Sequence, residues 1–372
     1  MEMSQIFEIE DKYDLWNEKI GDVNLWPIIR TFVLREKISK SKKLSKSHIS
    51  NRYKYLFSPN IIMYHLKAFN LKKINSYDIL FFIDSGDRYF DNTKGRHLNR
   101  LYDKYMEIAT NPIILERSFN GKIFEPYYGF ENRFFLEDSL AILVSLNSKF
   151  QNVNFKERKN ISDYARWIAE IYDLKEVEEN IEKMLFDGLK KTNSIKNMVK
   201  NTFASNSTIK ICFLNRSSYL GWWRGTITRI LHEFGFKILE IQHGFVSKSH
   251  YAYNYPDNIV KNLDHVSQKY LPDYLLMFGK YWADVVNTPS KKVILGYPYL
   301  DEIAKKLPIN IKEISNRILI ISQGTVTEKM ANIAIELSKK LSKYEIIFKL
   351  HPGRSHLKTD IQNYHHIKIL RL

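Results

Sequence analysis

A mostly apolar run that stops abruptly in a polar loop is the feature that most constrains the fold. Phe236–Ile241 is such a run, and Gln242-His243-Gly244 follows it directly. A run of this length, rich in Ile and Leu, predicts a buried strand. Tyr344–Leu350 has the same character and ends at His351-Pro352. Because α/β proteins bind ligands at the carboxyl ends of parallel strands, these strand ends predict two sites that face one cleft.

A compact strand–helix–strand unit leads into the first of these sites. Ile209–Leu214 predicts a strand, Asn215–Gly225 a polar loop and Thr226–Phe234 a helix that ends at Gly235. Phe236–Ile241 is then the parallel return strand, reached by a right-handed crossover. Further apolar runs predict strands at Tyr274–Phe278, Val293–Leu295, Arg317–Ile321 and Ile367–Leu370. This alternation predicts an α/β protein with parallel sheets.

The first clear strand, Tyr77–Ile83, also ends in a polar loop. Asp84 and Asp87 lie in that loop. A carboxylate at the end of a buried strand can act as a general base. An aspartate that caps a turn gives the same pattern, so both interpretations stand.

Helical spacing of apolar residues marks other segments. Tryptophans and aliphatic residues three or four apart predict a helix over Tyr13–Ile38, with Pro27 in a first turn. The same spacing predicts a helix or a helix pair over Ser162–Leu189. We also expect a helix at 96–105, an irregular segment at 119–135 and a connector at 190–201.

Length and charge limit the architecture and the partners. The 372 residues suit two domains, each with its own core. A polar, lysine-rich stretch predicts a boundary that leaves an N-terminal domain at 1–305, with helical additions at its start and at about 160–200, and a C-terminal domain at 306–372. The net charge of +16 favours an anionic partner: nucleotide phosphate, acidic polymer, nucleic acid or anionic lipid. Because the lysines are spread along the chain, the surplus of positive charge can equally lack a function.

The predicted C-terminal domain begins with a phosphate-type loop. Ser322-Gln323-Gly324-Thr325 follows a predicted strand, and Thr325 and Glu328 have the spacing of a capping box. Free backbone N–H groups and the helix dipole bind phosphate at such a position. His351-Pro352 ends the next strand of the same half, where proline rigidifies the turn.

The loop after Ile241 is the strongest candidate for chemistry. His243 can donate to a phosphate or shuttle a proton, whereas a histidine satisfied by backbone in a tight turn is the plain alternative. The strand end and the polar neighbours favour function. These neighbours are Gln242, Gly244, Lys248 and His250.

A second polar loop carries aromatic residues between two arginines. Trp222 and Trp223 lie between Arg216 and Arg224. The pair can stack on a sugar or a base, although packing explains most such pairs.

Missing motifs exclude several classes. The sequence has no Walker A motif and no G-x-G-x-x-G fingerprint, which argues against P-loop kinases and dinucleotide enzymes. No D-x-D pair, H-E-x-x-H motif or cysteine cluster indicates a metal, so we expect neither a metal nor another cofactor. The single cysteine, Cys212, forms no internal disulfide, and the first residues do not have the pattern of a signal peptide. These features favour a cytoplasmic protein that its charge can hold at the inner face of the cytoplasmic membrane.

Four motifs, in this order, resemble one family. They are the loop at 241–244, Pro272-Asp273-Tyr274 followed by Phe278-Gly279, Gly296-Tyr297-Pro298, and Phe348-Lys349-Leu350-His351-Pro352. The set resembles bacterial surface-polysaccharide glycosyltransferases of GT-B fold. Within these, it is most similar to capsule and O-antigen enzymes, the CDP-glycerol glycerophosphotransferases and the bacterial Kdo- and sialyltransferases. The resemblance covers about Ile209 to His356.

The resemblance implies two Rossmann-like domains that face each other across a cleft, with a nucleotide-sugar donor mainly on the C-terminal domain. His351 would contact the donor phosphates and help the nucleotide to leave. The donor side would comprise Ser322, Gln323, Gly324, Thr325, Lys349, His351, Pro352 and Arg354.

On the acceptor side, the resemblance places His243 near the leaving phosphate or the acceptor. Asp84 or Asp87 would deprotonate the acceptor hydroxyl. The acceptor would be a lipid-linked or polymeric glycan, and transfer would be metal-independent and inverting. Gln242, Gly244, Lys248, His250, Arg216 and Arg224 would line this side.

The chain departs from the family near its end. Members continue well past the His-Pro loop, whereas few residues follow Ile367 here. A Rossmann-type half needs on the order of 100 residues, so we expect an incomplete second domain with exposed apolar surface. One rival hypothesis is therefore a non-catalytic remnant that scaffolds polysaccharide assembly. The other is a basic nucleic-acid-binding protein, which the scattered lysines and the lack of a recognised module disfavour.

Overall fold

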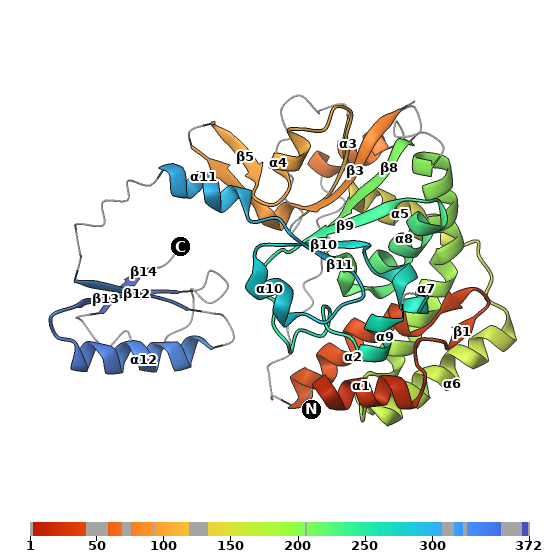
Figure 1. Ribbon diagram of the computed structural model, residues 1–372. Coiled ribbons are helices and arrows are strands. Elements are labelled where there is room, and N and C mark those ends of the chain that lie inside the picture. The colour runs from red at the N-terminus through yellow and green to blue at the C-terminus, as the bar shows by residue number, and fades with distance from the viewer. Residues whose placement is uncertain are drawn as a thin grey trace. The chain divides into compact units, whose positions relative to one another are not determined.

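The computed structural model describes residues 3–41, 59–68, 76–92, 94–118, 133–204, 207–262, 264–306, 316–322, 326–350 and 367–370 (Figure 1). The chain divides into two compact units, Met1–Ile303 and Ala304–Leu372. The expected boundary between residues 305 and 306 lies beside this division.

A seven-stranded parallel sheet organises the first unit. Its order is β11-β10-β9-β8-β3-β6-β7, and each neighbouring pair is parallel. The strands are β3 (Tyr77–Asp84), β6 (Ile113–Arg117), β7 (Phe134–Leu136), β8 (Ser207–Leu214), β9 (Lys237–Ile241), β10 (Tyr274–Met277) and β11 (Lys291–Ile294). The chain starts at the centre, builds one side of the sheet, then returns and builds the other. This order is that of a Rossmann-like fold, and the α/β prediction is confirmed.

Helices cover both faces of this sheet (Figure 1). On β3, Leu80 and Phe82 join the core beneath α5 (Glu137–Ser148), α7 (Glu178–Val199) and α8 (Gly221–Glu233). Phe81 and Ile83 point to the opposite face and pack with residues of α3 (Pro59–Ala68) and α4 (Asp103–Met106). Side chains alternate along a strand, so burial on both faces explains the continuous apolar run of β3.

A helical layer with its own core completes the first unit. The helices α1 (Met3–Lys12), α2 (Trp26–Ser41), α6 (Phe155–Ile171) and α7 enclose Trp16 and Trp26. Trp26 stacks on Tyr172, with ring centroids 5.6 Å apart. Both tryptophans thus serve to pack this layer.

The predicted helix over Tyr13–Ile38 is only half right. α2 has Pro27 in its first turn, as expected, but the preceding residues form the hairpin of β1 (Lys19–Ile20) and β2 (Val23–Asn24). Gly21 turns this hairpin at a φ of +61°, which glycine adopts without strain. The apolar residues before α2 are therefore part of the same core as the helix, although a turn and a hairpin carry them.

The predicted helix at 96–105 is wrong. Residues Arg96–Asn99 form β5, which pairs with β4 (Arg88–Asp91), and α4 starts only at Asp103. The Asn99 side chain accepts hydrogen bonds from the backbone N–H groups of Leu101 and Tyr102. That local turn competes with a helix, which explains the break.

Two helices extend further than their sequences suggested. The predicted pair over Ser162–Leu189 is confirmed as α6 and α7, but α7 runs to Val199 and a π-helical turn, Lys200–Ala204, follows. The predicted connector at 190–201 is wrong because Ile195 and Val199 are buried against the sheet. Likewise, α8 starts at Gly221, inside the predicted loop. Of the segment at 119–135, residues 119–132 lie outside the described part of the chain.

Short helices follow each of the last three strands of the first unit. They are α9 (Asp257–Lys261), α10 (Lys280–Val285) and α11 (Pro298–Lys306). In the described residues, no helix combines the length and apolar character that a membrane span requires.

The second unit contains a three-stranded parallel sheet. β12 (Arg317–Ile321), β13 (Glu345–Lys349) and β14 (Ile367–Leu370) pair in that order, and α12 (Thr327–Lys340) packs on one face. The predicted strands are confirmed. Leu319 and Ile321 are exposed.

Candidate functional site

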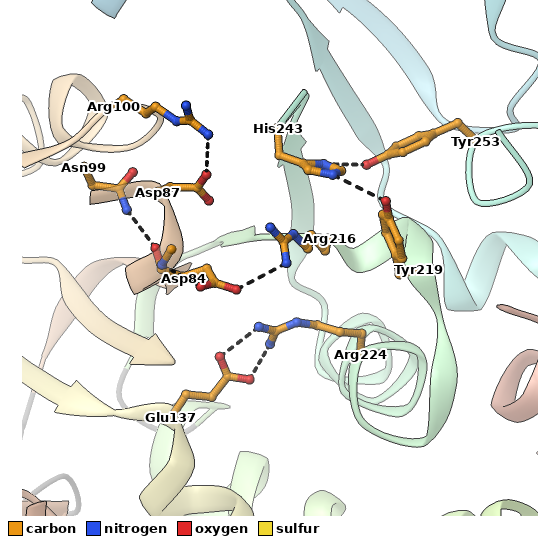
Figure 2. Close-up of polar contacts among 11 residues, drawn as sticks. Asp84, Asp87, Asn99, Arg100, Glu137, Arg216, Tyr219, Arg224, His243 and Tyr253 are labelled. Atoms are coloured by element: carbon orange, nitrogen blue, oxygen red, sulfur yellow. Dashed lines mark hydrogen bonds and ion pairs between the residues drawn. The ribbon is translucent and has the colours of Figure 1, made fainter. Parts of the chain in front are cut away.

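The predicted residues of the first unit gather at the point where the strand order reverses. β3 and β8 are neighbours in the sheet, but β3 leads to β6 on one side and β8 leads to β9 on the other. The loops after these two strands therefore diverge at their carboxyl ends, which is where open α/β sheets bind ligands. Asp84 ends β3, and Arg216 and His243 follow β8 and β9 (Figure 2).

The loop after β3 fixes both predicted aspartates. The Asp84 carboxylate accepts a hydrogen bond from the Gly86 backbone N–H at 2.8 Å and pairs with Arg216, whose Nη1 lies 3.4 Å from Oδ2. Asp84 thus caps the short turn Ser85–Asp87, as the second interpretation of the sequence predicted. It also faces the site. Its base role stays a prediction.

Asp87 is the more deeply buried of the two. Its Oδ1 accepts from Nη2 of Arg100 at 3.1 Å, whereas its buried Oδ2 has no partner among the described residues. Burial raises the pKa of the Asp87 carboxyl, and Arg100 and Arg216 oppose that rise. Asp87 is therefore a carboxylate that can still accept a proton or a hydrogen bond.

The loop after β8 holds Arg216 in an unusual backbone conformation. Arg216 has a φ of +58°, and Leu220, which precedes α8, has a φ of +57° with a ψ of −140°. Residues other than glycine adopt such conformations at a cost, and they gather at functional sites. Arg216 and Arg100 keep 41% and 44% of their side chains exposed. Two guanidinium groups are thus anchored by carboxylates and still open to a ligand.

His243 is held by two tyrosines (Figure 2). The Tyr253 hydroxyl lies 3.1 Å from Nδ1, and the Tyr219 hydroxyl lies 3.4 Å from Nε2. Tyr219 also lies 3.1 Å from Nε2 of His250. His250 therefore lies beside His243, as predicted for the same loop.

A buried glutamate sets the tautomer of His243. The Tyr253 hydroxyl donates to Oε1 of Glu240 at 2.5 Å, and Ser218 donates to Oε2 from both its backbone N–H and its hydroxyl, each at 2.7 Å. Because the Tyr253 proton goes to Glu240, the Tyr253 oxygen accepts from Nδ1–H of His243. Nε2 then carries the lone pair, which is the state a general base needs.

The surroundings keep His243 neutral. Burial lowers the pKa of His243 to about 4, and the nearby charges of Arg216, His250 and Arg100 act in the same direction. Burial raises the pKa of the Glu240 carboxyl, although its hydrogen bonds with Tyr253 and Ser218 oppose the rise. His243 is thus a neutral imidazole in a positive field.

Other predicted residues of this side have different surroundings. The Gln242 amide donates to the Gly244 carbonyl at 2.8 Å and accepts from the Phe278 N–H at 3.0 Å, so it links the loops after β9 and β10. Lys248 is exposed. Arg224 is buried in a bidentate pair with Glu137, at 2.5 and 2.8 Å, and is thereby occupied within the fold.

Aromatic rings line the same edge of the sheet. Tyr297 stacks on Phe278 with ring centroids 4.4 Å apart, and Tyr299 contacts both Tyr297 and Tyr89. Tyr297 lies within electrostatic reach of Arg100 and Asp87. We call Asp84, Asp87, Arg100, Arg216 and His243 the polar cluster. The aromatic row therefore continues from the polar cluster across the loops after β10 and β11.

Few of the predicted donor-side residues lie in the described part of the second unit. Ser322 is buried, and its hydroxyl donates to Thr327 Oγ1 at 2.8 Å. Lys349 ends β13 and is half-buried. Gln323, Gly324, Thr325, His351, Pro352 and Arg354 lie outside the described residues.

The described residues contain no group of three or more His, Cys, Asp or Glu that could hold a metal ion. A separate groove between α6 and α7 is lined by Arg158, Glu182, Lys183 and Phe186, among others, and carries none of the predicted site residues.

Sequence patterns did not reveal four residues of this site: Arg100, Tyr219, Glu240 and Tyr253. Glu240 had a signal, since a carboxylate inside an otherwise apolar strand needs a buried partner. The two tyrosines had none, because their role depends on the fold of the loops around His243. A scan against models of protein families finds no match to this chain, and a search of curated proteins finds no relative.

Proposed function

We propose that the chain is a glycosyltransferase that moves a sugar, or a polyol phosphate, from a nucleotide-activated donor to a hydroxyl of a glycan acceptor. The observation that carries this proposal is the orientation of His243. Its Nδ1 faces the Tyr253 hydroxyl, which in turn donates to Glu240, and this leaves Nε2 as a base at the carboxyl ends of the strands, beside two open guanidinium groups.

The proton transfer follows from this geometry. In this proposal the acceptor hydroxyl gives its proton to Nε2 of His243, in place of Asp84 or Asp87, as its oxygen attacks the anomeric carbon of the donor sugar. The bond from that carbon to the donor phosphate oxygen breaks, and the nucleotide leaves with the electron pair. Glu240 stabilises the imidazolium through Tyr253. Attack from the face opposite the phosphate inverts the anomeric centre.

Arg100 and Arg216 supply the complementary charge. They stabilise the anionic phosphate of the substrate or the leaving group, so no metal is required in this proposal. They also lower the pKa of His243 in the free protein. A bound anion removes that repulsion, raises the pKa of His243 and makes Nε2 a stronger base when substrate is present.

Two further features support a sugar nucleotide as substrate. The aromatic row of Phe278, Tyr297 and Tyr299 offers ring faces of the kind that pack against sugars. In the second unit, β12, α12 and β13 form a parallel βαβ motif, which suits a nucleotide-binding half of a GT-B enzyme.

The test begins with a thermal-shift screen of the full chain against CMP, CDP, UDP, GDP and dTDP. A ligand that binds the native state raises the melting temperature, so one nucleotide should stabilise the protein. The sugar donors of that nucleotide are then assayed for release of free nucleotide with glycan acceptors.

In the same assay, His243→Ala should lower turnover by about 100-fold or more, as expected for loss of a general base, without lowering the melting temperature of the nucleotide complex. His232→Gln, a histidine on α8 that bonds Asp273, is the matched control and should retain turnover. A nucleotide shift without turnover would support the non-catalytic remnant. Full turnover in His243→Ala would refute the assigned base.

A further inference from the structure

The connection between α5 and α6 exposes large apolar side chains. Phe150 and Phe155 are 86% and 84% exposed, and Leu146 in the last turn of α5 is 48% exposed. We call residues 146–160 the α5–α6 corner. Two nearly fully exposed phenylalanines within six residues of each other form an apolar surface that the fold itself does not use.

The backbone of this corner is firmly ordered by local hydrogen bonds. Asn154 caps α6 by accepting from the Glu157 N–H, and the Glu157 side chain accepts from the Asn154 N–H, each at 2.9 Å. Arg158 donates from Nε to the Val153 carbonyl at 3.2 Å. This capping box places Phe155 in the first turn of α6, directed to solvent. The exposure of Phe155 is therefore a property of a built helix end.

The same corner is strongly basic. It carries Lys149, Lys156, Arg158 and Lys159 against one acidic residue, Glu157, whose carboxylate already serves the capping box. The four basic side chains are exposed. Arg158 also lies over the ring of Phe186 on α7, 5.2 Å from its centroid, and Lys190 approaches the same ring. The two exposed phenylalanines thus share one short stretch of chain with four exposed cations.

The α5–α6 corner and the polar cluster lie toward opposite ends of the strands. α5 follows the carboxyl end of β7 directly, so its last turn and the corner lie toward the amino ends of the strands. His243 and Asp84 follow carboxyl ends. Figure 1 shows α6 on the side of the first unit away from α4 and β5. A partner at the corner therefore leaves the candidate site open.

We propose that the α5–α6 corner binds the surface of a membrane that contains anionic lipids. Phe150 and Phe155 enter the boundary between headgroups and acyl chains, while the surrounding lysines contact the lipid phosphates. Exposed aromatic rings among cations match both layers of such a surface. An acidic protein surface would match the charges alone. This inference is independent of the proposed transferase activity.

The test is co-sedimentation of the full chain with vesicles of phosphatidylcholine alone and of phosphatidylcholine with phosphatidylglycerol at about 30 mol%. The protein should bind the anionic vesicles at least about tenfold more tightly, and binding should weaken as salt is raised. Equal binding to both vesicles, or none to either, would overturn the proposal.

Substitutions separate insertion from charge attraction. The double variant Phe150→Ser/Phe155→Ser should lose about tenfold or more in affinity for the anionic vesicles, because the inserted apolar area is lost. The matched control is Phe245→Ser, a phenylalanine that is 67% exposed in the loop after β9, and it should bind as the parent does. Both sites are exposed, so these variants should fold. Unchanged binding of the double variant, or an equal loss in the control, would show that the corner does not insert.

Discussion

At the scale of single residues, the proposed role of His243 depends on three side chains that come from one strand and two different loops. Glu240 belongs to β9 itself, Tyr253 to the loop beyond it and Tyr219 to the loop after β8. The chemistry of the imidazole is therefore set by the way two adjacent strands end. His243 and Asp84 could be predicted from sequence because a polar residue after an apolar run is a local pattern. The tyrosine partners of His243 and the Arg100 partner of Asp87 could not, since these side chains reach the site only through tertiary folding.

The low pKa of His243 predicts a dependence of stability on pH. The folded-state pKa is about 4, and the ordinary value is 6.5. Between these values the unfolded chain binds a proton that the folded chain does not, so acidification favours unfolding. The free energy of unfolding should fall by up to roughly 3 kcal/mol as pH drops from 6.5 to 4 because of this residue, with no contribution above pH 6.5.

Chemical denaturation of the parent and of His243→Gln across this pH range checks the prediction. Burial also raises the pKa of the Asp87 carboxyl, so the difference between the two proteins is the relevant quantity. His232→Gln serves as the control and should follow the parent. A parent and a His243→Gln variant with parallel pH profiles would show that His243 is not depressed in the folded state.

At the scale of elements, an ion pair in the helical layer holds the loop that carries Tyr253. Arg30 of α2 donates from Nε to Glu10 of α1 at 2.7 Å, from Nη1 to the Tyr251 carbonyl at 2.6 Å and from Nη2 to the Asn254 carbonyl at 3.1 Å. Both side chains are fully buried. The helices that the sequence did not link to any function thus clamp the backbone on both sides of Tyr253.

We expect Arg30→Ala to destabilise the fold by about 3–5 kcal/mol, since it leaves Glu10 buried without its partner. Arg30→Lys should not restore stability, because an ammonium cannot span both carbonyls and the carboxylate. Beyond stability, Arg30 variants should shift the pKa of His243, measured by NMR of the imidazole, because Tyr253 loses its fixed position.

Arg224→Ala provides the comparison, since Arg224 is buried in a pair with Glu137 but makes no hydrogen bond to the Tyr253 loop. It should destabilise the protein while leaving Tyr253 in place. An Arg30 variant that unfolds more easily yet keeps the parent pKa of His243 would limit Arg30 to a structural role.

Element predictions succeeded where an apolar run had clear limits in the sequence. The strands β3, β12 and β13 appeared as expected because both the run length and its limits are local. The prediction of a helix at 96–105 failed because the Asn99 side chain accepts hydrogen bonds from two backbone N–H groups. The prediction of a connector at the end of α7 failed because two buried residues, Ile195 and Val199, stabilise a helix within a polar, lysine-rich sequence.

At the scale of the whole molecule, the division into two compact units predicts two unfolding transitions. Phe348→Ala removes a fully buried ring from the core of the second unit, and Phe82→Ala does the same in the first. Each should cost about 3–5 kcal/mol and lower only the transition of its own unit. Scanning calorimetry of the full chain separates the two. A single transition that moves with either substitution would mean that the units unfold together.

The pairing of β3 with β8 has a consequence for how the protein is made. Leu80 lies beside Cys212 in the sheet, although the two residues are 132 positions apart along the chain. At about 5–20 residues per second, a ribosome needs on the order of ten seconds to cover that interval. During this time β3 can pair with β6 but not yet with β8, so one of its edges stays unpaired. The cluster of Asp84, Arg216 and His243 is thus among the last parts of the first unit to form on a nascent chain, and chaperones that shield strand edges should matter most in that interval.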